Sequence, residues 1–333
     1  MNYEDHILGG LYGQALGDAW CMAAMLTPQQ TWERYGGWID RFYPGTADHP
    51  VHAGLIAGRI TDDTEQAFAL ADEILADGRV TVAAATRAVL RWYDQVGGEA
   101  CPYIGPSTRR AVAQLLRGVD PHETGKHGDT NGAAMRVSVV GLIHPGDPAA
   151  AVRDAALQAI PTHNTDVAIS GAAAVAAAVA AALSPGATLD TILAAGVAGA
   201  DEGRRLGPTY MGASVGRRIE LALAIAREDA DPRERIQKLY DIIGCTLATS
   251  ESVPAAFGVL AMADGDPLQT AVYAAALSGD ADTVGAIACA IAGAWNGAAA
   301  FPADIRTTLV TANPEYDFSG TAQRLAALAA ARS

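Results

Sequence analysis

Apolar residues recur every three or four positions along almost the whole chain, whereas the strict alternation of a half-buried β-strand is nearly absent. That period places apolar side chains along one face of an α-helix. We therefore expect amphipathic helices at 64–76, 82–93, 149–160, 189–200, 215–227, 232–247 and 268–277. No linker rich in Pro, Gly or Ser divides the chain, and no fixed repeat is visible. Residues 1–333 are accordingly predicted to form one all-α domain.

Small residues also recur at a spacing of four in three further stretches. The three series are Gly9, Gly13 and Gly17; Gly285, Cys289, Gly293 and Gly297; and Gly171, Val175 and Val179. Ridges of small side chains let two helix axes approach closely, although each helical glycine costs about 1 kcal/mol relative to alanine. We expect these helices to cross at the centre of the fold. The alternative is a composition that is simply rich in glycine and alanine.

The balance of charge is strongly acidic. Asp and Glu number 37 against 23 Lys and Arg, for a formal net charge of −14. Such a surface disfavours nucleic acid and anionic membranes as partners. The two longest apolar stretches, 168–183 and 284–301, consist mainly of alanine, so they fit buried helices better than membrane spans.

Two features favour the cytoplasm as the location. The first residues are polar and acidic, without the basic segment and apolar stretch of a secretory signal. The cysteines have neither zinc-site nor CxxC spacing, which is typical of reduced, buried thiols; they are Cys21, Cys101, Cys245 and Cys289.

Two short acidic motifs, far apart in the chain, carry the strongest chemical signal. They are Thr61-Asp62-Asp63-Thr64 and Asp280-Ala281-Asp282-Thr283, and each precedes an apolar-periodic stretch. Taken singly, each is more simply a helix start, with Thr61 as an N-cap and the carboxylates in the first turn. Taken together, they would bring four carboxylates and several hydroxyls to one point, and hard oxygen ligands select Mg²⁺ or Mn²⁺ rather than zinc.

Counter-charges near these motifs are few in the sequence. Arg59 lies just before the first motif, and neither Lys nor Arg lies near the second. Buried carboxylates cost several kcal/mol unless they are paired or bound to metal. A divalent cation is therefore the expected counter-charge.

Two further segments give weaker signals. Asp129 and Asn131 lie in a turn-rich stretch that either aims polar groups into a pocket or merely connects helices. His163 lies in a segment where Thr162 or Asn164 would cap the next helix, with the histidine at its mouth. The remaining histidines, His6, His49, His52, His122, His127 and His144, show no constellation, and a lone histidine is usually structural or solvated.

Taken in order, these segments resemble the ADP-ribosylglycohydrolase family. The resemblance rests on 9–19, 61–64, 130–136, 162–163 and 279–283, followed by Gly285, Gly293 and Gly297. It implies an orthogonal all-α bundle with a central cleft that holds two Mg²⁺ or Mn²⁺ ions. The implied reaction is hydrolysis of the C1′ glycosidic bond of an ADP-ribosyl group, in a ribosyl small molecule or an ADP-ribosylated substrate.

The resemblance also implies roles for single residues. Thr61, Asp62 and Asp63 would bind one metal, Asp280 and Thr283 the other, and Asp282 would bridge them. Asn131 and Gly132 would line the ribose–phosphate pocket, and His163 would contact the distal ribose or the diphosphate. The expected catalytic carboxylates are Asp63, Asp129 and Asp282, with Asp129 as a base or water-orienting group.

One position departs from the family pattern. Met25 falls where the family often has a metal-facing glutamate. Segment 37–45 also resembles a bacterial subgroup for which a small nucleoside or a free ADP-ribosyl compound is a fair candidate substrate. Two alternatives therefore stand beside the ADP-ribosyl hydrolase: a nucleoside N-ribohydrolase, and a relative that binds ADP-ribose without cleaving it.

Overall fold

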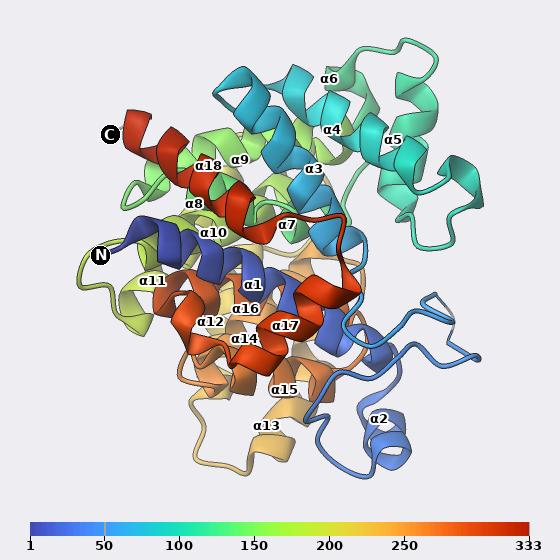
Figure 1. The fold of residues 1–333 in the computed structure, drawn as a ribbon, viewed down its shortest axis with the longest axis vertical. Coiled ribbons are helices and arrows are strands. Elements are labelled where there is room, and N and C mark those ends of the chain that lie inside the picture. Colours follow the sequence, from blue (N-terminus) through green and yellow to red (C-terminus); the bar gives the residue numbers. More distant parts are fainter. Residues whose placement is uncertain (50, 333) are drawn as a thin grey trace.

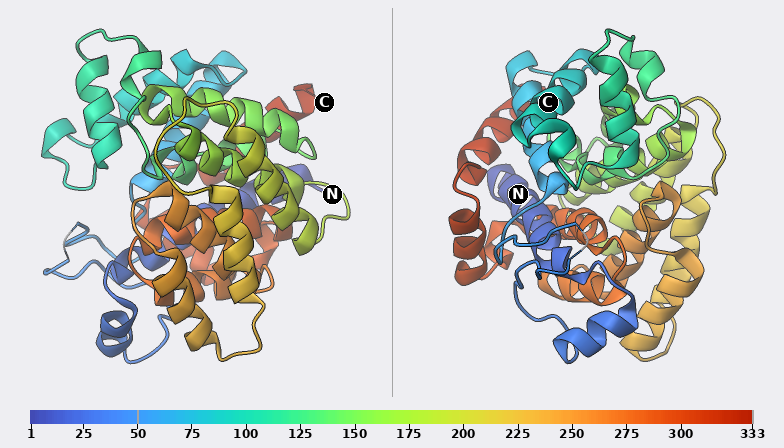
Figure 2. Two further views of the ribbon diagram at one scale, coloured as in Figure 1. Left: turned by 180° about the vertical axis from the view of Figure 1, so that it is seen from behind. Right: turned by 90° about the vertical axis from the view of Figure 1, so that its right-hand side faces the viewer.

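The computed structural model describes residues 1–49 and 51–332, and over these residues its regular elements are all helices, joined by loops and without a strand. The predicted all-α orthogonal bundle is thus confirmed, and Figures 1 and 2 show its helices crossing at steep angles. The helices of the described residues are α1 (Tyr3–Cys21), α2 (Pro28–Tyr35), α3 (Asp62–Asp77), α4 (Val82–Gln95), α5 (Pro106–Leu115), α6 (Pro121–Thr124), α7 (Gly132–Met135), α8 (Ser138–Leu142), α9 (Pro148–His163), α10 (Asp166–Ala182), α11 (Leu189–Gly203), α12 (Val215–Ala226), α13 (Pro232–Lys238), α14 (Thr249–Met262), α15 (Pro267–Leu277), α16 (Ala281–Asn296), α17 (Ala303–Ala312) and α18 (Phe318–Arg332).

The two glycine ridges meet face to face, as their spacing predicts, in the pair α1 and α16 at the middle of the molecule (Figure 1). A Cβ on Gly13 would lie 2.0 Å from the carbonyl oxygen of Cys289, and one on Gly17 would lie 1.9 Å from that of Gly285. Only glycine permits this backbone approach. The crossing also brings Asp18, next to Gly17, close to Asp282 at the start of α16.

The third series lies on α10, which is buried along its whole length. A Cβ on Gly171 would lie 2.2 Å from the Thr249 side chain on α14, so these two helices also approach closely. Both long alanine stretches are therefore core helices. Within residues 1–49 and 51–332, no helix combines the length and the apolar character that crossing a membrane requires.

One expected helix ends early. The stretch 232–247 forms α13 and a π-helical turn at Leu239–Ile243, and then the chain turns at Gly244. Gly244 has φ +89°, in the left-handed region, and a Cβ there would lie 2.6 Å from Glu251. The helical period continues in the sequence past a position where the backbone cannot continue the helix. The residues after Gly244, which are Cys245, Thr246 and Leu247, instead line a cavity.

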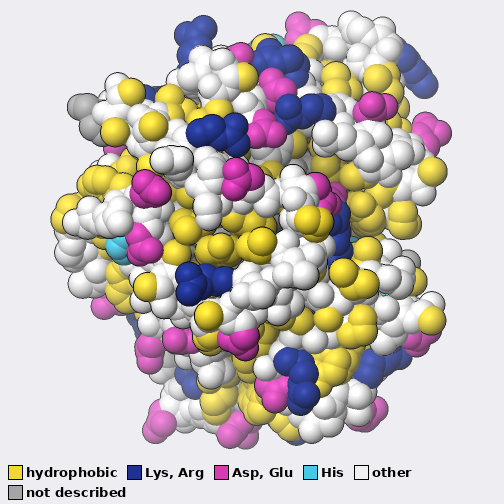
Figure 3. All heavy atoms as spheres, in the orientation of Figure 1, with side chains coloured by type: hydrophobic (Ala, Val, Ile, Leu, Met, Phe, Trp, Pro, Cys, Tyr) yellow, Lys and Arg dark blue, Asp and Glu magenta, His cyan; other side chains and the backbone are white. Residues whose placement is uncertain are grey.

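Charged side chains are mixed over the surface. On the face shown in Figure 3, Lys and Arg lie scattered among Asp and Glu, with apolar side chains between them. This face therefore offers no continuous basic surface to a polyanion.

Candidate active site

The structure brings the two acidic motifs together at a cavity of about 430 Å³. Helix α3 begins at Asp62 and α16 begins at Ala281, so both helices direct their N-termini at the same space. Their motifs contribute to its wall Asp62, Asp63, Asp280, Asp282 and Thr283. The positive ends of two helix dipoles and several backbone N–H groups thus face these carboxylates.

Asp18 of α1 holds the first motif in place. Its carboxylate accepts hydrogen bonds from the backbone N–H of Thr61 at 2.9 Å and of Thr64 at 3.2 Å. The hydroxyls of the same two threonines donate to it at 2.7 and 2.6 Å. The Thr61 side chain therefore does not cap α3, contrary to the expectation, because its hydroxyl is turned to Asp18. Burial raises the pKa of Asp18 to about 6, against the lowering effect of these donors.

The second motif is held from two other parts of the chain. Asn131 Nδ2 donates to Asp280 Oδ2 at 2.5 Å and also lies 2.9 Å from the hydroxyl of Ser252. Burial and the charge of Asp282 raise the pKa of Asp280 to about 7. His52 Nε2 lies 2.9 Å from Asp282 Oδ2. Burial alone would raise the pKa of Asp282, but the hydrogen bond and charge of His52 lower it.

His52 is the main residue of this site that sequence reasoning missed. It lies in the loop between α2 and α3, where its backbone N–H donates to His49 Nδ1 at 2.8 Å. Burial alone would lower the pKa of His52, but the hydrogen bond with Asp282 and the surrounding carboxylates raise it. The expectation that these two histidines belong to no constellation is therefore wrong. Nothing in the local sequence signals a contact with a residue so far along the chain.

His52 is the partner of Asp282, but the other carboxylates of the cavity have no Lys or Arg beside them in the described wall. Among the lining residues that the structure describes, none is Lys or Arg. Arg59, the nearest basic residue in the sequence, pairs instead with Glu65 and Glu315. Burial and the charge of Asp282 raise the pKa of Asp62 and of Asp63 well above the usual range.

The donor set suits a hard divalent cation, and one oxygen is free to bind it. Asp63 Oδ1 is buried and has no hydrogen-bond partner among the described residues, and such an atom is costly unless something pairs with it. Within the part of the chain that the structure describes, however, no group of three or more His, Cys, Asp or Glu side chains is arranged to hold a metal ion. The chemistry of these residues fits a cation, whereas their side-chain positions do not converge on one point.

The remaining predicted site residues divide into two groups. Asn131 and Gly132 line the cavity, as does Met25 in place of the acid that the family pattern suggests. Asp129 is half-buried and does not belong to the wall; its carbonyl oxygen accepts a hydrogen bond from the Thr249 hydroxyl at 2.9 Å. This geometry gives no support to Asp129 as a base, and that role stays a prediction.

His163 occupies a different place from the one expected. It is the last residue of α9, which continues through Pro161, and Thr165 rather than Thr162 or Asn164 caps α10. The ring is fully buried behind Gly132, with Nε2 3.0 Å from the hydroxyl of Thr130 in the cavity wall. Burial holds the pKa of His163 well below its usual value, so the ring is neutral. The His163 ring does not line the cavity itself; it lies behind two residues that do, Thr130 and Gly132.

Known proteins resemble this chain in sequence and in fold. A sequence model described as ADP-ribosylglycohydrolase matches residues 1–333. The chain is 36% identical over 327 residues to the protein YegU of Escherichia coli K12, covering 97% of this chain and 96% of that one. It is 30% identical over 183 residues to the ADP-ribosylarginine hydrolase Tri1 of Pseudomonas putida GB-1, covering 50% of this chain and 43% of that one. In fold it resembles the solved structure of an ADP-ribosylglycohydrolase-related protein complex, with a TM-score of 0.71 at 24% identity over 98% of this chain and 99% of that one.

Proposed function

Because the chain belongs to the ADP-ribosylglycohydrolase family, we propose that it is a metal-dependent hydrolase that cleaves the C1′ glycosidic bond of an ADP-ribosyl group. The observation that carries the proposal is the cavity itself. Two acidic motifs from distant parts of the chain share its wall, and among the described lining residues no Lys or Arg balances them. His52 partners Asp282 alone, and buried carboxylates that outnumber their basic partners favour a bound cation.

The residues that would hold two Mg²⁺ or Mn²⁺ ions are those of the two motifs. Thr61, Asp62 and Asp63 would serve one ion, Asp280 and Thr283 the other, and Asp282 both. When bound, a pair of divalent ions activates a water and orients ribose hydroxyls. Carboxylates beside C1′ stabilise the positive charge of an oxocarbenium-like transition state, and we assign that role to Asp63 and Asp282. Asn131 and Gly132 would contact the ribose and phosphate, with neutral His163 behind them.

The test measures release of ADP-ribose from ADP-ribosylated arginine and serine substrates, with Mg²⁺ or Mn²⁺ and with a chelator. We expect turnover that the chelator abolishes and the metal restores. The substitution Asp282→Asn should abolish turnover. The control is Asp304→Asn, which replaces an exposed carboxylate in the first turn of α17 and should leave turnover unchanged. Absence of turnover on every ribosyl substrate would refute the proposal.

A second candidate is hydrolysis of the glycosidic bond of free nucleosides, which carry no diphosphate. The same observation favours it: the described wall offers no Lys or Arg to a diphosphate, and it includes the apolar side chains of Tyr103, Ile104 and Leu247. A panel of free nucleosides tested against ADP-ribosyl compounds separates the two, because the second candidate predicts that diphosphate-bearing ligands bind no better than nucleosides. Ligand binding that leaves the ribosyl bond intact would instead indicate a non-catalytic relative, consistent with Met25 in the wall.

We also propose a cytoplasmic location. All four cysteines are free and buried in the structure, in keeping with a reducing compartment. Cell fractionation should recover the protein in the cytoplasmic fraction, and its recovery outside the cell membrane would contradict this proposal.

A further inference from the structure

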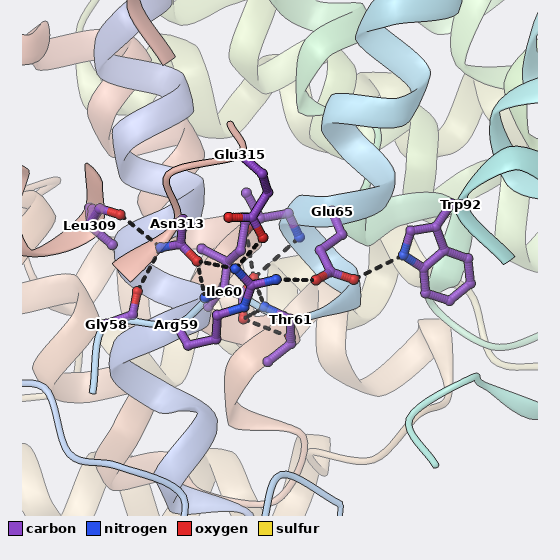
Figure 4. A network of polar contacts seen from close by, with 11 residues as sticks. Gly58, Arg59, Ile60, Thr61, Glu65, Trp92, Leu309, Asn313 and Glu315 are labelled. Atoms are coloured by element: carbon purple, nitrogen blue, oxygen red, sulfur yellow. Dashed lines mark hydrogen bonds and ion pairs between the residues drawn. The ribbon is translucent and has the colours of Figure 1, made fainter. Parts of the chain in front are cut away.

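We propose that Asn313, far from the acidic motifs in the sequence, is a positioning residue that fixes the approach of the chain to Asp62 and Asp63. Asn313 follows α17 directly and is fully buried. The inference rests on the proposed function, because the position it explains is that of the first metal-binding motif. Figure 4 shows the network around it.

All the hydrogen-bonding capacity of the Asn313 amide is used on two short segments. Its Nδ2 donates to the carbonyl oxygens of Gly58 and Leu309, both at 2.8 Å. Its Oδ1 accepts from the backbone N–H of Ile60 at 3.1 Å and from Arg59 Nη1 at 3.2 Å. Three consecutive residues, 58 to 60, are thus tied to one side chain just before the motif begins. A buried amide with every bond satisfied holds its partners in one geometry.

The loop is also seated directly on α17. Gly58 has φ +82°, and a Cβ there would lie 2.7 Å from Thr308 Cγ2 and 3.4 Å from the Ala312 side chain. The sequence uses glycine where the backbone is left-handed and closely packed at once. The contact with α17 therefore fixes the position of Gly58, which lies only a few residues before the motif.

Arg59 extends the same attachment into α3. It pairs with Glu315 after α17 and, through Nη2, lies 3.1 Å from Glu65 Oε1 in the first turn of α3. Trp92 of α4 donates to the other oxygen of Glu65 at 3.0 Å. The segment that follows α17 thus holds both the loop before the motif and the helix after it.

The motif is clamped between two anchors. Asp18 binds the backbone and hydroxyls of Thr61 and Thr64, while Asn313 binds the residues immediately before them. Groups that orient metal-binding residues without touching the metal typically contribute 10- to 100-fold to metal affinity or activity. Loss of the Asn313 amide should therefore let residues 58–60 shift and weaken the binding of metal at Asp62 and Asp63.

The experiment compares Asn313→Ala with Asn296→Ala in the full chain. Asn296, at the end of α16, is an exposed control with the same pattern of donated bonds: its Nδ2 also donates to a glycine carbonyl, of Gly265 at 3.0 Å, and to the carbonyl four residues earlier, of Ala292 at 2.9 Å. Titration with Mn²⁺ in a calorimeter should show an affinity about tenfold weaker for Asn313→Ala and unchanged for Asn296→Ala. Excess Mn²⁺ should restore part of the lost activity in Asn313→Ala, which a purely structural role would not allow.

Gly58→Ala provides a second variant if Asn313→Ala does not fold. It displaces the same loop from α17 without removing a polar group, and it should weaken Mn²⁺ binding in the same direction. The inference is overturned if the wild-type protein binds Mn²⁺ and both variants, folded by circular dichroism, bind it equally well. Absence of Mn²⁺ binding and of turnover in the wild-type protein is a different result, which overturns the proposed function and the inference with it.

Discussion

Replacing Gly13 by alanine should destabilise the protein by about 2 kcal/mol. The new Cβ would lie 2.0 Å from the carbonyl oxygen of Cys289, where ordinary contact begins at 3.4 Å. That oxygen belongs to the backbone of α16, so the two helices must separate by about 1.4 Å over part of their crossing. We take the upper end of the usual overpacking cost, about 3 kcal/mol, and subtract about 1 kcal/mol for the better helix propensity of alanine.

The assay is scanning calorimetry of the metal-free protein. Near 60 °C the entropy of unfolding is about 2.1 cal/mol/K per residue, or about 0.7 kcal/mol/K for 333 residues. A loss of 2 kcal/mol therefore lowers the unfolding temperature by about 3 °C. Gly10→Ala on the same helix is the control, because its Cβ would crowd the flexible end of the Leu142 side chain, at 2.7 Å, and no backbone atom. If Gly13→Ala melts at or above the temperature of Gly10→Ala, the close backbone crossing is not what the glycines provide.

Three further outcomes are expected. Asp282→Ala should lose bound metal more completely than Asp62→Ala in elemental analysis, since a bridging residue serves both ions; equal retention in the two variants would contradict the bridge. Burial raises the pKa of Asp18 to about 6 and, with the charge of Asp282, that of Asp280 to about 7. Because the folded state then binds these protons more tightly than the unfolded state, unfolding temperatures of the metal-free protein should fall as pH rises from about 4 to about 7, and a rise over that window would refute the assignment. Burial also raises the pKa of all four cysteine thiols, so a thiol reagent at pH 8 should label the native protein slowly and the urea-unfolded protein fast; rapid labelling of the native protein would contradict this burial.

The glycine ridges show how much of the fold the sequence could predict. A spacing of four, read from Gly9 to Gly17 and from Gly285 to Gly297, predicted two helices and their crossing, because backbone contact leaves few residue types acceptable. The helix 232–247 was predicted too long, since the apolar period does not reveal that Gly244 is left-handed. The period of a helix is local information, whereas its end here lies at a left-handed glycine packed so closely against Glu251 that a Cβ would not fit.

The candidate site divides in the same way. The acidic motifs are visible in the sequence because each joins several oxygen ligands to a helix start. Asp18 was visible only as part of a resembling segment, and His52 and Asn313 were not visible at all. Each of these three acts through contacts with a distant part of the chain: Asp18 with Thr61 and Thr64, His52 with Asp282, and Asn313 with residues 58–60. Such contacts leave no periodic trace in the sequence around the residue that makes them.

The pairing of α1 with α16 has a consequence for synthesis on the ribosome. The glycine ridge of α1 is translated long before its partner on α16. Until α16 is made, that face of α1 stays uncovered, and apolar surfaces on unfinished chains are prone to aggregation. We expect chaperones to cover α1 during translation, and a messenger truncated before α16 to yield a product that is degraded rather than a smaller folded protein.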